Sequence, residues 1–197
     1  MAGQDFPVAT GGAAAADPDV VKIYSATAGS GGVASFDTGT IDVSAYRSLQ
    51  ILFSGRTDSQ GAAAGADGVE VHYNNDTTAS NYVGVAHVAG RNTSNNDLND
   101  TFVPSTPSLF AIPDNTVTPN SLLSSGVAWI SLTGSSHYTT STSQSMNFRG
   151  VTTTTFRLIY QYARTWKNTD SITRITLQPT AGGNFVEGSS CQILGVT

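Results

Sequence analysis

The sequence predicts an all-β protein, a two-sheet antiparallel sandwich of the jelly-roll type. From Val20 onward, short runs rich in β-branched and aromatic residues alternate with clusters of Gly, Asn, Asp, Ser and Pro, which suit turns. No stretch of helical length keeps an apolar face at a spacing of three to four residues. The runs are too numerous for one flat sheet, so we expect two stacked sheets. The expected strands are VVKIYSA, SLQILFSG, GVEVHY, YVGVAHVAG, VAWISL, MNFRG, TTTFRLIYQYAR, ITRITLQP and CQILGV.

The run at 156–164 alternates most clearly between apolar and polar residues. Such a period of two indicates a strand with one face packed on the core and the other in water. We assign Phe156, Leu158, Tyr160 and Tyr162 to the core face and Arg157, Gln161 and Arg164 to the opposite face. A later run repeats the pattern with Ile175 and Leu177.

The composition excludes several classes of function. Only 12% of the 197 residues are charged and the net charge is -5, with the nine Lys and Arg residues scattered singly. A nucleic-acid-binding surface needs clustered basic residues, so we expect no nucleic-acid partner. No run approaches 18 apolar residues, so we expect no membrane span. The first residues, MAGQDFPVATGG, lack the pattern of a signal peptide, so we expect synthesis in a cytoplasm.

Motifs that would carry chemistry are missing from the sequence. There is no G-x-S-x-G elbow, P-loop or dinucleotide fingerprint. The three histidines, His72, His87 and His137, are not within ligand spacing of one another or of Cys191, which we expect to be a buried apolar residue. The Asn-rich segment 92–100 is expected to be a solvated loop, with calcium binding as the alternative. We therefore expect no enzyme, no cofactor and no metal.

Two regions differ in composition. Residues 1–19 are rich in Gly and Ala, whereas residues 20–197 carry the β pattern of the sandwich domain. We expect residues 1–19 to form an arm that docks on its own domain or on neighbouring subunits, with Phe6 and Pro7 as its apolar anchor.

The segment HYNNDTTASNY, residues 72–82, is the most unusual loop. Its Asn and Asp side chains can bond nearby backbone amides, and Asn tolerates left-handed backbone conformations. We expect a braced loop that fixes two core strands and is locked by Arg56 or Asp58. The alternative is a saccharide or partner site in which Tyr82 stacks and the amides bond. The candidate residues for the brace or the partner contact are Arg56, Asp58, Asn74, Asp76, Asn81 and Tyr82.

Three segments occur in a recognisable order: GRTD at 55–58, HYNNDTTASNY at 72–82 and ITRITLQPTAGGNFVEGSSCQILGV at 172–196. This order, over roughly residues 45–196, resembles a group of β-sandwich structural proteins of tailed-bacteriophage virions. The chain departs from their pattern at Leu194, where those proteins often have Tyr before the glycine, and at Asn75, which replaces a frequent glycine.

The resemblance implies a place in the virion and two alternative functions there. The first is a capsid decoration, or cement, protein on the capsid surface, made in the host cytoplasm. Its partners would be the major capsid protein and copies of itself, as a homotrimer. The second is a tail-associated module that recognises a host-surface glycan. For the glycan reading we expect polar loops such as Ser135–Ser145, with Trp129, Tyr138 or Trp166 as stacking faces.

Overall fold

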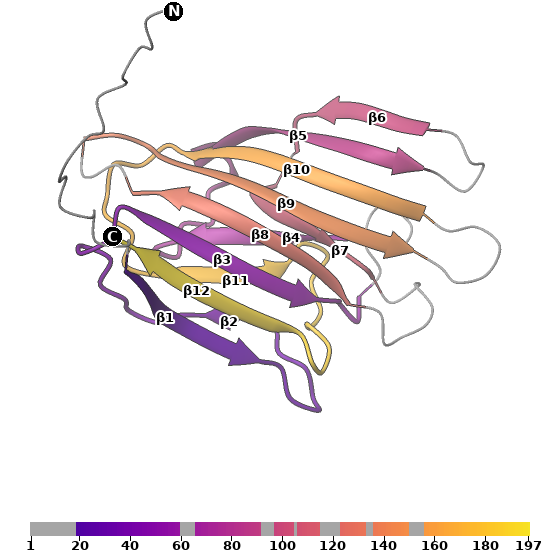
Figure 1. The fold of residues 1–197 in the computed structure, drawn as a ribbon, viewed down its shortest axis with the longest axis horizontal. Coiled ribbons are helices and arrows are strands. Elements are labelled where there is room, and N and C mark those ends of the chain that lie inside the picture. The colour runs from indigo at the N-terminus through magenta and orange to yellow at the C-terminus, as the bar shows by residue number, and fades with distance from the viewer. Residues whose placement is uncertain are drawn as a thin grey trace, which may run out of the picture.

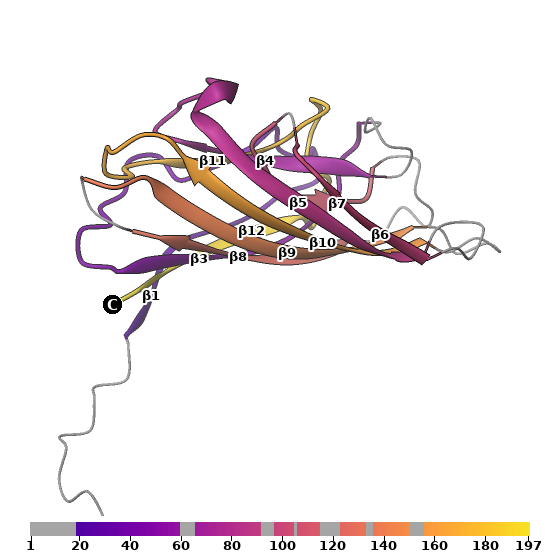
Figure 2. The same ribbon diagram turned by 90° about the horizontal axis from the view of Figure 1, so that it is seen from above.

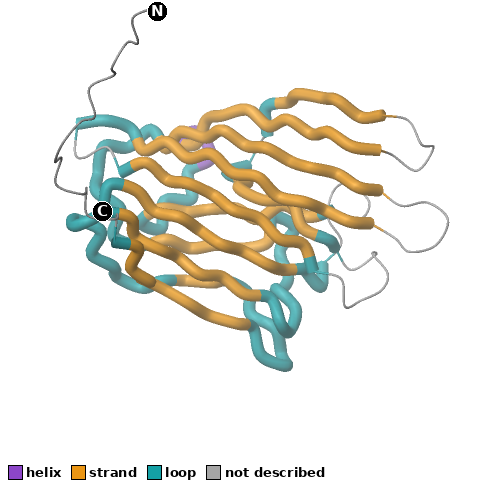
Figure 3. Tube along the Cα trace, viewed as in Figure 1, coloured by secondary structure: helices purple, strands orange, loops and turns teal. Residues whose placement is uncertain are grey.

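The computed structural model confirms the predicted all-β class and the two-sheet sandwich (Figures 1 and 3). Its described residues include a single short 3-10 turn, at Ala79–Asn81. Most of the N-terminal arm, including Phe6 and Pro7, lies outside the described residues. The structure describes residues 19–59, 66–91, 97–104, 106–114, 123–132, 136–149 and 156–197.

The described residues form twelve strands. The strands are β1 (Val20–Thr27), β2 (Phe36–Asp37), β3 (Ser48–Gly55), β4 (Asp67–Tyr73), β5 (Tyr82–Arg91), β6 (Asp97–Phe102), β7 (Ser108–Ile112), β8 (Ser124–Ser131), β9 (Thr139–Arg149), β10 (Phe156–Trp166), β11 (Ile175–Pro179) and β12 (Ser190–Val196). Strands β2, β6 and β7 lie outside the nine expected runs, and β9 begins earlier than the run MNFRG predicted.

Two antiparallel sheets of unequal width form the sandwich. The large sheet has the order β1-β12-β3-β8-β9-β10-β5-β6, and the small sheet has the order β2-β11-β4-β7. Figure 1 shows the large sheet across the front with the small sheet behind it, and Figure 2 shows the two layers from above. Because the large sheet is wider, β5 and β6 extend past β7, the edge of the small sheet. The arrangement is compatible with a jelly roll.

Phenylalanines from both sheets and the last loop form the centre of the core. Phe36 stacks on Phe185 with ring centroids 5.0 Å apart, and Phe53 stacks on Phe110 at 5.4 Å. Phe53 and Phe185 join the two pairs at 5.3 Å. Aromatic pairs at these separations add to the free energy gained from burying their area. Cys191 lies in the same core and is buried, as expected.

The predicted alternation in β10 is confirmed for Tyr162, which is buried, and is wrong for Arg164; Leu158 and Tyr160 are half-buried, and the side chains of Phe156 and Arg157 lie outside the described part. Residues 162, 164 and 166 share one face because strand side chains alternate, and Tyr162, Arg164 and Trp166 are all buried. The Arg164 guanidinium donates to the carbonyl oxygens of Ser108 (3.1 Å) and Thr106, so a buried cation links β10 to the start of β7.

Strand β9 also corrects an expectation, because the sequence suggested polar loops at Ser135–Ser145. Residues from Thr139 belong to a central strand, and its inward side chains are hydroxyls and an amide. Ser145 Oγ accepts from the Ala111 amide (3.0 Å), Ser143 Oγ donates to the Leu109 carbonyl, and Asn147 donates to the Ile112 carbonyl (3.3 Å). These side chains satisfy the backbone groups that β7 exposes at the edge of the small sheet.

The Asn-rich segment 92–100 is not wholly a loop. Its last residues, from Asp97, pair with β5 as part of the edge strand β6. Asn99 of this segment contacts His87 of β5: Asn99 Oδ1 and His87 Nε2 are 2.6 Å apart.

Candidate functional site

The loop between β4 and β5 begins with two left-handed residues. Asn74 and Asn75 have φ of 53° and 60°, values that Asn adopts more readily than most residues. The Asn74 side chain oxygen accepts from the amides of Thr173 (2.7 Å) and Arg174 (3.1 Å), and its amide donates to the Ser171 carbonyl (2.9 Å). The turn is therefore bonded to the segment that precedes β11.

The Asp76 carboxylate holds the middle of this loop. Its Oδ2 accepts from Trp166 Nε1 (2.8 Å) and Asn81 Nδ2 (2.9 Å), and its Oδ1 accepts from the Thr78 amide (2.9 Å). Burial opposes ionisation of Asp76, but these hydrogen bonds outweigh it and the pKa of the carboxyl is lowered. The Asp76 carbonyl in turn accepts from the Tyr82 hydroxyl (2.9 Å).

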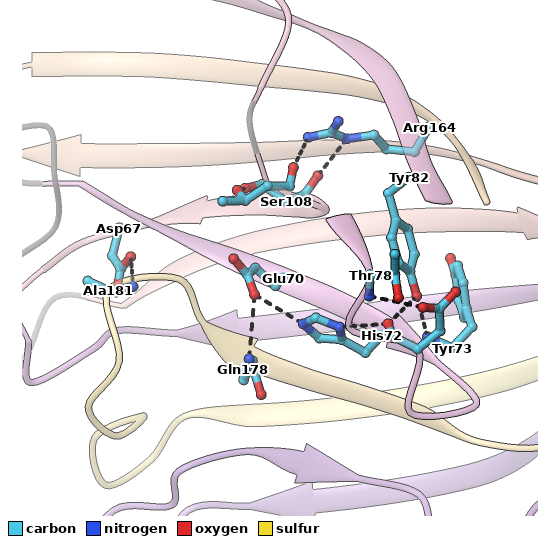
Figure 4. A network of polar contacts seen from close by, with 12 residues as sticks. Asp67, Glu70, His72, Tyr73, Thr78, Tyr82, Ser108, Arg164, Gln178 and Ala181 are labelled. Carbon is cyan, nitrogen blue, oxygen red and sulfur yellow. Dashed lines mark hydrogen bonds and ion pairs between the residues drawn. The ribbon is translucent and has the colours of Figure 1, made fainter. Parts of the chain in front are cut away.

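A buried histidine continues the network, as Figure 4 shows. His72 Nδ1 faces the Asp76 carbonyl and Nε2 faces the Glu70 carboxylate, each at 3.0 Å. Both partners are acceptors, so the imidazolium, which donates from both nitrogens, satisfies the site better than the neutral ring. The hydrogen bond to Glu70 therefore raises the pKa of His72, although burial opposes the shift.

Arg56 and Asp58 do not lock this loop. They follow β3, and their neighbours lie at the other end of β4. The Asp58 carboxylate accepts from the Asn184 amide (2.7 Å), and Arg56 is buried with Asp114 as a charged neighbour. The sequence predicted the correct residue types but paired them with the wrong loop, because it does not show that 55–59 and 182–189 are adjacent.

The loop is thus a brace, and it does not have the features of a binding site. The Tyr82 ring is 7% exposed, so it offers no stacking face, and Trp166 is buried beneath the loop. The polar groups described above bond to one another, which leaves few of them for a ligand.

A broader candidate is the outer face of the large sheet, which we define as the solvent-facing side chains of β3, β8, β9, β10 and β5. Strand registers place Trp129, Thr142, Ala163 and Val85 side by side across four strands. No Asp, Glu, Lys or Arg occurs among the described side chains on this face. The large apolar side chains exposed on it, by 38 to 46% each, are Leu52, Val83, Val85, Trp129, Met146 and Ile159.

A shallow groove of about 490 Å³ runs along this outer face. Trp129 and Val85 border it together with the side-chain amides of Gln144 and Gln161. Protein interfaces are depleted in charge at their centres and enriched in aromatic residues and Met, and this face has the same composition. The sequence contains these apolar residues in its predicted strands, but only the structure shows that they lie on the outward face of the sheet.

Other classes of site are not indicated in the described part of the chain. No three residues of the types His, Cys, Asp and Glu gather there as a metal site would require. Within the same residues, no helix has the length and apolar character needed to cross a membrane. Comparison of the chain with protein-family models, curated proteins and solved structures finds no match.

Proposed function

We propose that this chain is a non-enzymatic structural protein of a tailed-bacteriophage virion, specifically a capsid decoration protein. The outer face of the large sheet carries the proposal. In this proposal the chain forms a trimer on the capsid surface, where it binds the major capsid protein. The order of the sequence motifs supports the virion setting, and the sandwich fold agrees with it.

The composition of the outer face supports the proposal that this face contacts another protein. Contiguous exposed apolar side chains on a soluble protein commonly mark an interaction site. The described side chains of this face include no Asp, Glu, Lys or Arg, so covering them with another protein costs less solvation energy than burying unpaired charges would. Many weak contacts of this kind, repeated over a shell, add up through multivalency.

Imaging of virions labelled with an antibody against the chain tests the location. Labels spread over the head support the proposal, and labels confined to the tail contradict it. Light scattering on the purified chain should give the mass of a trimer. Release of reducing sugar from a polysaccharide by the isolated chain would contradict the non-enzymatic assignment.

A charge placed on the outer face tests the surface itself. Val85→Glu should weaken binding to heads that lack the protein by at least about tenfold, because the carboxylate must be desolvated. Val21→Glu is the matched control, since Val21 is 43% exposed and Val85 41%, but Val21 lies on the edge strand β1. Equal binding by both variants would assign the contact to another surface.

The second candidate function is a tail-associated module that recognises a host-surface glycan. One observation favours it, a cleft between the two sheets on the side opposite the outer face of β10. Its lining is unlike the outer face, because it contains carboxylates and hydroxyl groups as well as aromatic rings.

A further inference from the structure

A cleft of about 600 Å³ lies where the large sheet extends past the small one. Strands β10, β5 and β6 form one wall, and the start of β4, the strand β7 and the turn after β11 form the other. This volume lies within the range of small-ligand sites. The lining residues used below are Asp67, Gly68, Asp100, Phe102, Ser108, Tyr160, Tyr162 and Thr180.

A column of stacked side chains stiffens the wall on β10. The rings of Tyr160 and Tyr162 are 6.2 Å apart and nearly parallel, at 10°. The Arg164 guanidinium lies 5.9 Å from the centroid of Tyr162 on the same strand. Arg164 also donates to the carbonyls of Thr106 and of Ser108, the latter labelled in Figure 4, so its guanidinium is held by backbone acceptors and fixes the position of this wall.

The opposite wall presents oxygen atoms. Asp67 is 4% exposed, and its carboxylate accepts from the amides of Gly68 (2.8 Å) and Ala181 (3.1 Å), the latter drawn in Figure 4, and from the Ser59 hydroxyl (3.2 Å). Beside it, a Cβ on Gly68 would lie 2.5 Å from Thr180 Oγ1 and 3.0 Å from Ser108 Oγ. The absence of a side chain at Gly68 therefore allows these two hydroxyls to lie close to its backbone. Thr180 Oγ1 is buried and has no hydrogen-bond partner among the described residues, so its hydrogen-bonding capacity is not used within them.

The rim supplies an exposed aromatic ring and a second carboxylate. Phe102 is 39% exposed although its side chain borders the cleft, and Asp100 precedes it by two residues on β6. An exposed aromatic ring beside hydroxyl and carboxylate oxygens matches the alternating apolar and hydroxyl surfaces of a sugar ring. Among the described lining residues there is no Lys or Arg, and the carboxylates of Asp67 and Asp100 are the charged groups, so anionic ligands are disfavoured.

We propose that this cleft binds a neutral saccharide, with Phe102 as the stacking face and the hydroxyls and carboxylates as hydrogen-bonding groups. The site does not depend on the position of the protein in the virion. A decoration protein and a tail module could both carry it, and it shares no described side chain with the Trp129 row of the outer face.

Calorimetry or ligand-observed NMR on the full chain tests the proposal. The probes are maltohexaose, cellohexaose and mannan as neutral saccharides, and alginate and polygalacturonate as acidic ones. Binding of at least one neutral probe, and weaker or no binding of the acidic probes, is expected. Failure of every neutral probe to bind at millimolar concentration, or binding of acidic probes alone, would overturn it.

The variant Phe102→Ala should weaken binding of the neutral probe about tenfold, whereas Phe102→Tyr should retain it. The matched control is Ile159→Ala, because Ile159 is 40% exposed but lies on the outer face. Both truncated positions are exposed, so the fold should tolerate each change. Equal affinity of Phe102→Ala and the parent chain would overturn the site. Binding of Phe102→Ala to heads that lack the protein should be unchanged, so failure of this proposal can be told apart from failure of the proposed function.

Discussion

Asp76 shows how one side chain can hold a loop, a strand end and a core tryptophan together. Its carboxylate receives donors from Trp166 on β10, from Asn81 near the start of β5 and from the Thr78 amide within the loop. Hydrogen bonds to a charged acceptor are stronger than those between neutral groups. The indole of Trp166 is 1% exposed, so its N–H has little access to water when Asp76 is altered.

Replacing Asp76 with Asn should therefore destabilise the fold. The amide places a donor where the carboxylate accepted, and the free energy of unfolding should fall by about 2–3 kcal/mol. Urea unfolding followed by tryptophan fluorescence measures the change. Asp170→Asn, at an exposed loop position, is the control and should have little effect. A loss below about 0.5 kcal/mol in Asp76→Asn would show that water replaces the carboxylate.

His72 should make stability depend on pH. Its pKa in the folded protein is raised above the ordinary value of about 6.5 by the hydrogen bond to Glu70. The resulting stabilisation is present in full below the unfolded pKa and is lost as pH rises through the folded pKa. Stability measured by urea unfolding should therefore decrease as pH rises above about 6.5, the ordinary pKa of histidine.

The variant His72→Gln isolates this effect. Glutamine offers one donor group and does not titrate, so the slope of stability against pH should flatten over the same window. His87→Gln, at a half-exposed position on the outer face, should keep the slope of the parent chain. An unchanged slope in His72→Gln would assign the pH dependence to another group.

The contact between β9 and β7 is unusual for a sandwich core because polar side chains make it. Strand β7 ends the small sheet, so one side of its backbone has no strand partner. Hydroxyls of β9 take the place of that partner, and glycine at 126 on β8 leaves room for the Phe110 ring of β7, which would lie 2.5 Å from a Cβ there. The edge of the small sheet is thereby protected from pairing with another chain.

Removing one hydroxyl from this contact should be costly. Ser145→Ala leaves the buried Ala111 amide without its acceptor, and the free energy of unfolding should fall by about 1–3 kcal/mol. Gln144→Ala, one residue away on the outer face, should change it by less than about 0.5 kcal/mol. Urea titration of both variants provides the comparison, and equal effects would show that the Ala111 amide finds another acceptor.

At the scale of the whole molecule, the sandwich begins with strand β1, directly after the N-terminal arm. Strand β1 begins at Val20 and pairs along its length with β12, and the Thr197 amide lies 3.4 Å from the Asp19 carbonyl. The pairing of β1 with β12 is therefore made entirely by residues from Asp19 onward.

Deletion of residues 1–18 should leave the free energy of unfolding within about 0.5 kcal/mol of the parent. Deletion of residues 1–27 also removes β1, and should lower the free energy of unfolding by at least about 2 kcal/mol because β12 loses its pairing with β1 and keeps only that with β3. Chemical unfolding measures both. If the arm docks on neighbouring subunits, the shorter deletion should also weaken the trimer, and light scattering should then give a mass below that of three chains. Destabilisation by the shorter deletion would show that the arm packs on its own domain.

Much of this structure follows from local patterns in the sequence. The β class, most strand positions, the left-handed Asn turn at 74–75 and the buried Cys191 could be predicted, because each depends on residues close together in the chain. The bracing role of Asp76 could be predicted in kind, since Asp in such a loop bonds nearby amides.

The tertiary structure decided which polar residues face inward. Arg164, Ser143 and Ser145 belong to the buried side because their partners, carbonyls and an amide of the segment 106–111, lie at least 34 residues away along the chain. A period of two reports the polarity of a strand's faces but cannot show that a free backbone edge will meet one of them. The same limit applies to the outer face, whose described side chains include no Asp, Glu, Lys or Arg, and to the cleft, since both arise from strands that are distant in sequence and adjacent only in the folded sheets.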